Sequence, residues 1–172
     1  MHEIEYYLAL RRRYEPVSIK LVVVAESPPA SGKYFYDPEG SIKEPLFTAL
    51  MQQFGYEPST KEQGLQALQR DGRVLVDATY QPVNKLIPAD RDEVIEKDYF
   101  RLRLDLERLN SDRSAPLILI KANVCRILEP KLKEDHFNVL NRGSRDYFPS
   151  NGQQTRFHQQ FGAILKSARI SN

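Results

Sequence analysis

Two acidic residues, Glu26 and Asp77, each follow a run of apolar residues that is typical of a buried strand. Neighbouring strands of a parallel sheet end at the same edge, so we expect the two carboxylates to lie close together. Paired carboxylates can serve as general base and charge stabiliser, because their repulsion raises the pKa of one and leaves the other ionised. The sequence therefore predicts catalytic roles for Glu26 and Asp77, with the capping of a turn by Asp77 as the alternative.

The segment after Glu26 contains groups that can enclose a flat ligand. Pro28 and Pro29 stiffen its backbone. Three consecutive aromatic residues follow: Tyr34, Phe35 and Tyr36. We expect these rings to line a preorganised pocket, and the alternative is that they only cap the hydrophobic core.

The loop 141–154 combines cations with the start of the last predicted helix. Arg142 and Arg145 supply positive charge, and Ser150 or Asn151 is placed to cap that helix. Free backbone amides at a helix start, together with arginines, favour phosphate binding. The loop therefore predicts phosphate contacts from Arg142, Arg145 and Ser150, with Lys33 as a further candidate; helix capping alone explains Ser150 equally well.

Composition excludes several classes of function. The 172 residues include 25 Lys and Arg against 23 Asp and Glu, and a net charge of +2 neither requires nor excludes a polyanionic partner. The single cysteine, Cys125, cannot form an internal disulfide, and no cluster of Cys and His has the spacing of a zinc site. None of the three histidines lies in a loop at a strand end. We therefore expect no metal, no organic cofactor and no catalytic histidine.

The distribution of apolar residues and the single cysteine predict a cytoplasmic protein. No run of eighteen or more apolar residues is present, and the first residues lack the apolar core of a signal peptide. The lone cysteine fits a reducing compartment, where we expect it to be part of the core. Membrane spanning and secretion are therefore not expected.

The pattern of elements predicts an α/β fold. Helical spacing of apolar residues occurs in the segments 4–13, 45–54, 60–70, 92–109, 123–132 and 153–168. Strand-like apolar runs occur at 19–25, 73–78, 116–120 and, more weakly, 137–140. Alternation of strands and helices favours a short four-stranded parallel sheet between two layers of helices. We expect one α/β/α domain over residues 1–172, with ligands bound outside the carboxyl ends of the strands.

Four segments, taken in order, resemble the motifs of the uracil-DNA glycosylase superfamily. They are Val22–Pro29, Val74–Asp77, Leu117–Ala122 and Phe148–Ser150. The superfamily has a four-stranded parallel sheet flanked by helices, a Gly-Glu-Ala-Pro-Gly type motif after its first strand, and a His-Pro-Ser motif before its last helix. The order of the motifs spans most of the chain. The resemblance implies a protein that binds DNA and acts on a flipped base.

The resemblance also implies roles for individual residues. Glu26 would orient or activate water, and Phe35 or Tyr36 would stack on the base. Asp77 stands where the superfamily has a base-reading asparagine, and an ionised Asp only accepts hydrogen bonds. Uracil would lose a partner at Asp77, whereas a base with an exocyclic amine would gain one. Phe148 stands where the superfamily has the histidine of its His-Pro-Ser motif, so the hydrogen-bond donor of that histidine is missing. Loss of such a donor commonly lowers the reaction rate by about two to three orders of magnitude.

We therefore expect a divergent DNA glycosylase-like protein of DNA repair that binds a flipped base or nucleotide. Its reaction would be hydrolysis of the N-glycosidic bond of a base other than uracil. Two alternatives stay open: a non-catalytic nucleic-acid or nucleotide binding module of the same fold, and a small-molecule hydrolase. A monomer is favoured.

Overall fold

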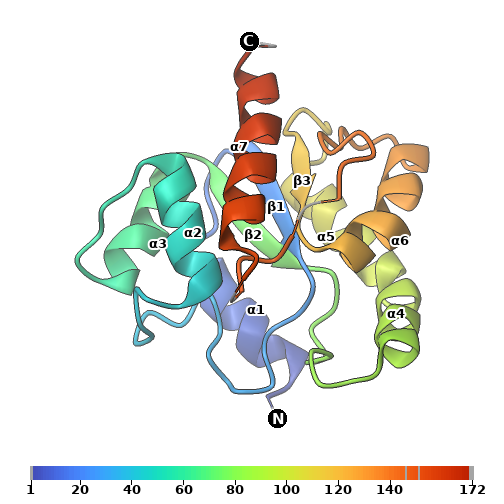
Figure 1. Ribbon diagram of the computed structural model, residues 1–172, viewed down its shortest axis with the longest axis horizontal. Coiled ribbons are helices and arrows are strands. Elements are labelled where there is room, and N and C mark those ends of the chain that lie inside the picture. Colours follow the sequence, from blue (N-terminus) through green and yellow to red (C-terminus); the bar gives the residue numbers. More distant parts are fainter. Residues whose placement is uncertain (1, 146, 151, 171–172) are drawn as a thin grey trace.

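A parallel sheet forms the centre of the computed structural model of the protein, which describes residues 2–145, 147–150 and 152–170. Its central strand is β1 (Leu21–Ala25), which pairs with β2 (Arg73–Asp77) on one side and with β3 (Leu117–Leu119) on the other. The three strands therefore have the order β2-β1-β3 (Figure 1). All residues of β1 are buried, as its unbroken apolar sequence predicts for a central strand.

Helices connect and cover the strands. Within the described residues these are α1 (Ile4–Arg12), α2 (Pro45–Phe54), α3 (Lys61–Arg70), α4 (Pro88–Lys97), α5 (Tyr99–Leu109), α6 (Ala122–Glu134) and α7 (Gln154–Ile170). None of these helices is long and apolar enough to cross a membrane. The predicted alternation of strands with helices is confirmed.

Two hydrophobic cores lie on opposite faces of the sheet. Val23 and Ala25 of β1 point into a core shared with α1, α2, α3 and α7. Val22 and Val24 point into a second core, shared with α4, α5 and α6. Successive side chains of a strand point to opposite faces, so this division follows directly from the strand geometry. Helices therefore cover both faces of the sheet (Figure 1).

The predicted long helix over 92–109 is wrong, because the structure has two helices that meet at Asp98. The Asp98 carboxylate accepts hydrogen bonds from the Thr79 hydroxyl at 2.5 Å and the Gln81 amide at 3.3 Å. These bonds tie the junction of α4 and α5 to the loop after β2. The apolar spacing runs through both helices, so periodicity alone did not show the break.

The predicted fourth strand over 137–140 is also wrong: only an isolated parallel bridge joins Val139 to Leu117. Beyond it, the side chain of Asn141 replaces a backbone partner of β3. Its Oδ1 accepts from the Leu119 amide at 2.8 Å, and its Nδ2 donates to the Leu119 carbonyl at 2.9 Å. The edge of β3 is thus satisfied by backbone groups at Leu117 and by a side chain at Leu119. Among the described residues, the sheet has three strands rather than four.

This arrangement makes Asn141 a structural residue. Asn141→Ala removes the partner of the buried Leu119 amide and leaves the Leu119 carbonyl with only the weak Cys125 thiol donor at 3.5 Å, so we expect the free energy of unfolding to fall by about 2 to 4 kcal/mol. Asn138→Ala is the matched control, because Asn138 is exposed and only its backbone carbonyl bonds to β3. The control should change stability by less than about 0.5 kcal/mol in urea unfolding. Equal effects of the two substitutions would contradict the role of the Asn141 side chain.

Candidate functional site

A cavity of about 440 Å³ lies at the carboxyl ends of β1 and β2. Its wall includes the segment that follows β1, the start of α2, the end of β2 and part of the segment before α7. Ligand sites in parallel α/β sheets occur at this edge, and the volume lies in the usual range for small-molecule pockets. The cavity is therefore the candidate functional site.

Glu26 lies in the wall of this cavity and is held on both carboxylate oxygens. Its side chain is 6% exposed. The Lys121 ammonium donates to Oε1 at 2.7 Å, and the Asn123 amide donates to Oε2 at 2.6 Å. The guanidinium of Arg91 lies 3.9 Å from Oε2. These contacts fix the orientation of Glu26, while its oxygens keep lone pairs that can accept a hydrogen bond from a ligand or water.

Lys121 is placed by an unusual backbone conformation. It precedes α6 with φ of 86°, a region that side-chain-bearing residues rarely adopt. Such a conformation costs about 1 to 3 kcal/mol and is concentrated at functional sites. Sequence reasoning missed Lys121 and Asn123, although both follow a buried strand just as Glu26 does. Applying the same strand-end rule to the third strand would have found them.

Asp77 is the second carboxylate of the cavity, but it has a different environment. It ends β2, directly opposite Ala25 of β1, and is 4% exposed. Within the described part of the chain, its buried Oδ2 has no hydrogen-bond partner. Burial raises the pKa of Asp77 to about 7, against the opposing effect of the Arg11 charge, and the charge of Glu26 raises it further. Asp77 is therefore a carboxyl group that can hold a proton near neutral pH.

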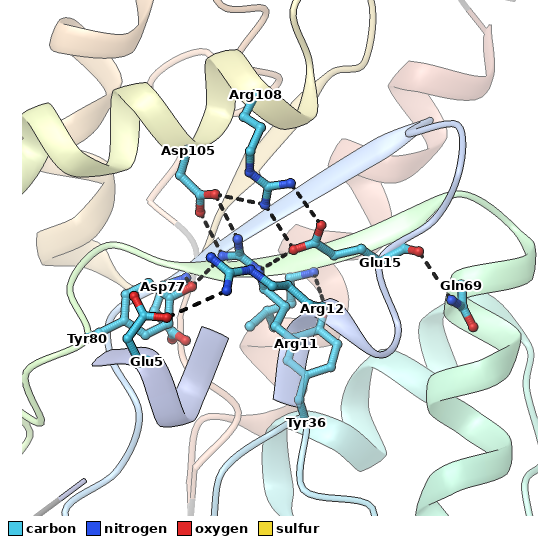
Figure 2. Close-up of polar contacts among 11 residues, drawn as sticks. Glu5, Arg11, Arg12, Glu15, Tyr36, Gln69, Asp77, Tyr80, Asp105 and Arg108 are labelled. Carbon is cyan, nitrogen blue, oxygen red and sulfur yellow. Dashed lines mark hydrogen bonds and ion pairs between the residues drawn. The ribbon is translucent and has the colours of Figure 1, made fainter. Parts of the chain in front are cut away.

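The guanidinium of Arg11, whose charge influences Asp77, does not bind its carboxyl group, because its donors are used elsewhere (Figure 2). Arg11 is completely buried. Its guanidinium donates to both oxygens of Asp105 at 2.7 Å, to the Tyr80 hydroxyl at 2.5 Å and to Glu15 at 3.2 Å. The Tyr80 oxygen also accepts a long bond, 3.4 Å, from the backbone amide of Asp77. Arg11 thus joins α1 to α5 and to the end of β2 without a hydrogen bond to the Asp77 carboxyl.

The predicted aromatic group divides into rings that reach the cavity and one that does not. Tyr34, Phe35 and Phe148 lie in the cavity wall, together with Phe47, which sequence reasoning missed. Tyr36 instead belongs to the core, where its hydroxyl accepts a hydrogen bond from the Leu75 amide at 2.7 Å. Tyr34 and Phe35 line the cavity and also belong to the same core cluster as Tyr36, whereas Tyr36 lies in the core and not in the cavity wall.

A buried lysine anchors the aromatic segment. The Lys61 ammonium donates to the Tyr34 carbonyl at 2.7 Å and to the Glu44 carboxylate at 2.6 Å. Burial lowers the pKa of Lys61, and the contact with Glu44 opposes this effect. Lys61 thus connects α3 to the segment after β1 and to the start of α2. It holds Tyr34, whose buried hydroxyl has no hydrogen-bond partner among the described residues.

The predicted phosphate contacts also divide into two groups. Lys33 and Ser150 are exposed residues in the cavity wall. Arg142 and Arg145 are exposed but lie outside that wall, in the loop that follows Asn141. The alternative capping residue, Asn151, lies outside the described residues. The structure thus brings Lys33 and Ser150 to the cavity, and it does not bring the two arginines there.

The described residues contain no group of three or more His, Cys, Asp or Glu side chains placed to hold a metal ion. Cys125 is buried, as predicted for a core residue. The cavity combines a fixed carboxylate, a carboxyl group that can carry a proton, aromatic walls and cations from Lys33 and Lys121. This set can bind a flat polar ligand and can move a proton between that ligand and water.

Comparison with protein-family models, curated proteins and solved structures finds no match for the chain. The similarity to uracil-DNA glycosylases is therefore a prediction from the quoted motifs.

The burial of Asp77 predicts a pH-dependent stability. Its folded pKa of about 7 exceeds the unfolded value of roughly 3.9, so its contribution is fully present below about pH 4 and is lost as the pH rises through 7. Asp77→Asn cannot ionise, and above pH 7 it should be more stable than the wild type by up to about 4 kcal/mol. This difference should disappear near pH 4 in urea unfolding measured at several pH values.

Asp90→Asn is the control for this measurement, because Asp90 is exposed in the first turn of α4. Its effect should stay within about 1 kcal/mol, without a rise between pH 4 and pH 7. Destabilisation by Asp77→Asn above pH 7 would contradict the account of an ionised, unpaired carboxylate.

Proposed function

We propose that the cavity binds a nucleobase with an exocyclic amine, presented by DNA or by a nucleotide, as in a divergent uracil-DNA glycosylase-like protein. The observation that carries the proposal is the buried, unpartnered oxygen of Asp77 in the cavity wall. A buried acceptor without a partner is costly, and a ligand N–H would satisfy it. Exocyclic amines of bases are donors of this kind.

The aromatic residues support a flat ligand. Tyr34 and Phe35 from the segment after β1, Phe47 of α2 and the half-buried Phe148 line the cavity, and Phe148 is the most exposed of the four. A flipped base is normally held by stacking against such side chains and by hydrogen bonds to its edge. Lys33 and Ser150, both exposed in the cavity wall, would contact the adjoining phosphate.

The two carboxyl groups support hydrolysis of the N-glycosidic bond. In the proposed step, a water molecule oriented by Glu26 bonds to the sugar carbon C1′ and transfers a proton to the Glu26 carboxylate. The bond from C1′ to the base nitrogen breaks, its electron pair leaves with the base, and the protonated form of Asp77 supplies a proton to the base. Lys121 and Asn123 keep Glu26 oriented during this step.

A binding module without catalysis is the second candidate. It is favoured by Phe148, which stands where the resemblance places a histidine, and by the engagement of both Glu26 oxygens. In that case the cavity would hold the base, and Glu26 would serve only to stabilise the site.

The test is base release from single- and double-stranded oligonucleotides that carry uracil, hypoxanthine, xanthine, or alkylated guanine and adenine. We expect release of an amine-bearing base, reduced at least about a hundredfold in Glu26→Gln and in Asp77→Asn. Asp90→Asn, a carboxylate outside the cavity wall, is the matched control and should retain full activity.

Binding in the same assays separates the candidates. Salt-dependent binding that Asp77→Asn alters, without release of any base, would support the binding module. Absence of binding to every oligonucleotide and nucleotide would contradict both candidates and leave the small-molecule hydrolase of the sequence analysis.

A further inference from the structure

The carboxyl group of Asp77 is enclosed by other ionisable groups, yet its buried oxygen has no partner within the described residues. Six ionisable residues interact electrostatically with Asp77. They are Tyr7 and Arg11 of α1, Glu26, Tyr34 and Tyr36 after β1, and Tyr80 after β2. The cavity wall adds Lys33, Glu44 and Lys121.

Two cations of this set, Arg11 and Lys121, are engaged elsewhere, and the third, Lys33, is exposed. Each nitrogen of the Arg11 guanidinium donates to another acceptor, as Figure 2 shows. Lys121 pairs with Glu26 at 2.7 Å. An isolated buried carboxylate is unfavourable, so Asp77 must take up either a proton or a ligand with hydrogen-bond donors. Its pKa of about 7, raised by burial, is consistent with this choice near neutral pH.

The two forms of a carboxyl group match different base edges. An ionised carboxylate offers two acceptors and suits an edge with two adjacent N–H donors, such as N1–H and the 2-amino group of guanine. A neutral carboxyl offers one donor and one acceptor, and it suits an edge with one N–H and one carbonyl, as in hypoxanthine or uracil. Asparagine offers the same pair of functions as the neutral carboxyl.

We propose that Asp77 is a specificity-determining residue that selects a guanine-type edge when ionised and accepts a hypoxanthine- or uracil-type edge when protonated. This inference rests on the proposed base-binding function and adds the class of base to it. The neutral form does not discriminate between guanine and hypoxanthine, because both carry N1–H next to a carbonyl. The ionised form discriminates, because hypoxanthine has a C2–H where guanine has its 2-amino group and therefore donates one hydrogen bond fewer to the carboxylate.

The experiment compares the binding of 2′-deoxyguanosine and 2′-deoxyinosine monophosphates by calorimetry, from below to above the pKa of Asp77. These nucleotides differ only in the 2-amino group. The affinity ratio in favour of the guanine nucleotide should rise by at least about tenfold as the pH increases, because the ionised carboxylate loses a hydrogen bond with hypoxanthine.

Two variants sharpen the comparison. Asp77→Asn should give a ratio that does not change with pH, because an amide stays neutral. Glu26→Gln should keep the rise but move its midpoint to lower pH, because the Glu26 charge raises the pKa of Asp77. A ratio independent of pH in the wild type would overturn the inference and leave base binding intact. Failure of both nucleotides to bind would overturn base binding and the inference together.

A titration of the wild-type protein tests the inference without any variant that could misfold. The side-chain carboxyl ¹³C signal of Asp77 in the free wild-type protein should titrate with a midpoint near 7. Titration in the ordinary range of aspartate, around pH 4, would overturn the inference without any substitution.

Discussion

A completely buried guanidinium is stable only when its N–H groups find acceptors, and Arg11 meets this requirement with Asp105, Glu15 and Tyr80. These contacts join the first helix to α5 and to the loop after β2. They also determine the chemistry of the cavity. Because Arg11 is used in this way, Asp77 has a positive charge nearby but no hydrogen bond from it, and its carboxyl group remains available to a ligand.

The cavity carries several features that are unfavourable for stability. Among the described residues, Oδ2 of Asp77 and the hydroxyl of Tyr34 are buried without a hydrogen-bond partner, and Lys121 has a strained backbone. All three residues lie in the wall of one cavity. Such features persist when surrounding structure holds them, and they are concentrated where a protein binds or reacts. Their coincidence at the carboxyl ends of β1 and β2 is the strongest structural argument for a functional site there.

Much of this organisation follows from local rules that the sequence displays. Unbroken apolar runs predicted β1, β2 and β3, and the position after such a run predicted that Glu26 and Asp77 share one edge of the sheet. Helix ends could also be predicted, since Thr60 accepts a bond from the Gln63 amide and Gly55 ends α2 with a φ of 75°.

Features that depend on distant contacts could not be predicted in this way. The break at Asp98 depends on Thr79 and Gln81, and the edge of β3 depends on the side chain of Asn141 rather than on a fourth strand. The partners of Glu26 come from residues almost one hundred positions away, and the environment of Asp77 depends on Arg11 in the first helix. Periodicity contains no information about such pairings.

A crystal structure of the protein with a bound guanine nucleotide tests base binding at Asp77 most directly. We expect the base to lie in the cavity, with its N–H donors within hydrogen-bonding distance of the Asp77 carboxyl and its ring against Phe35 or Phe148. A nucleotide bound elsewhere on the protein, with the Asp77 carboxyl still unpartnered, would contradict base binding at this cavity.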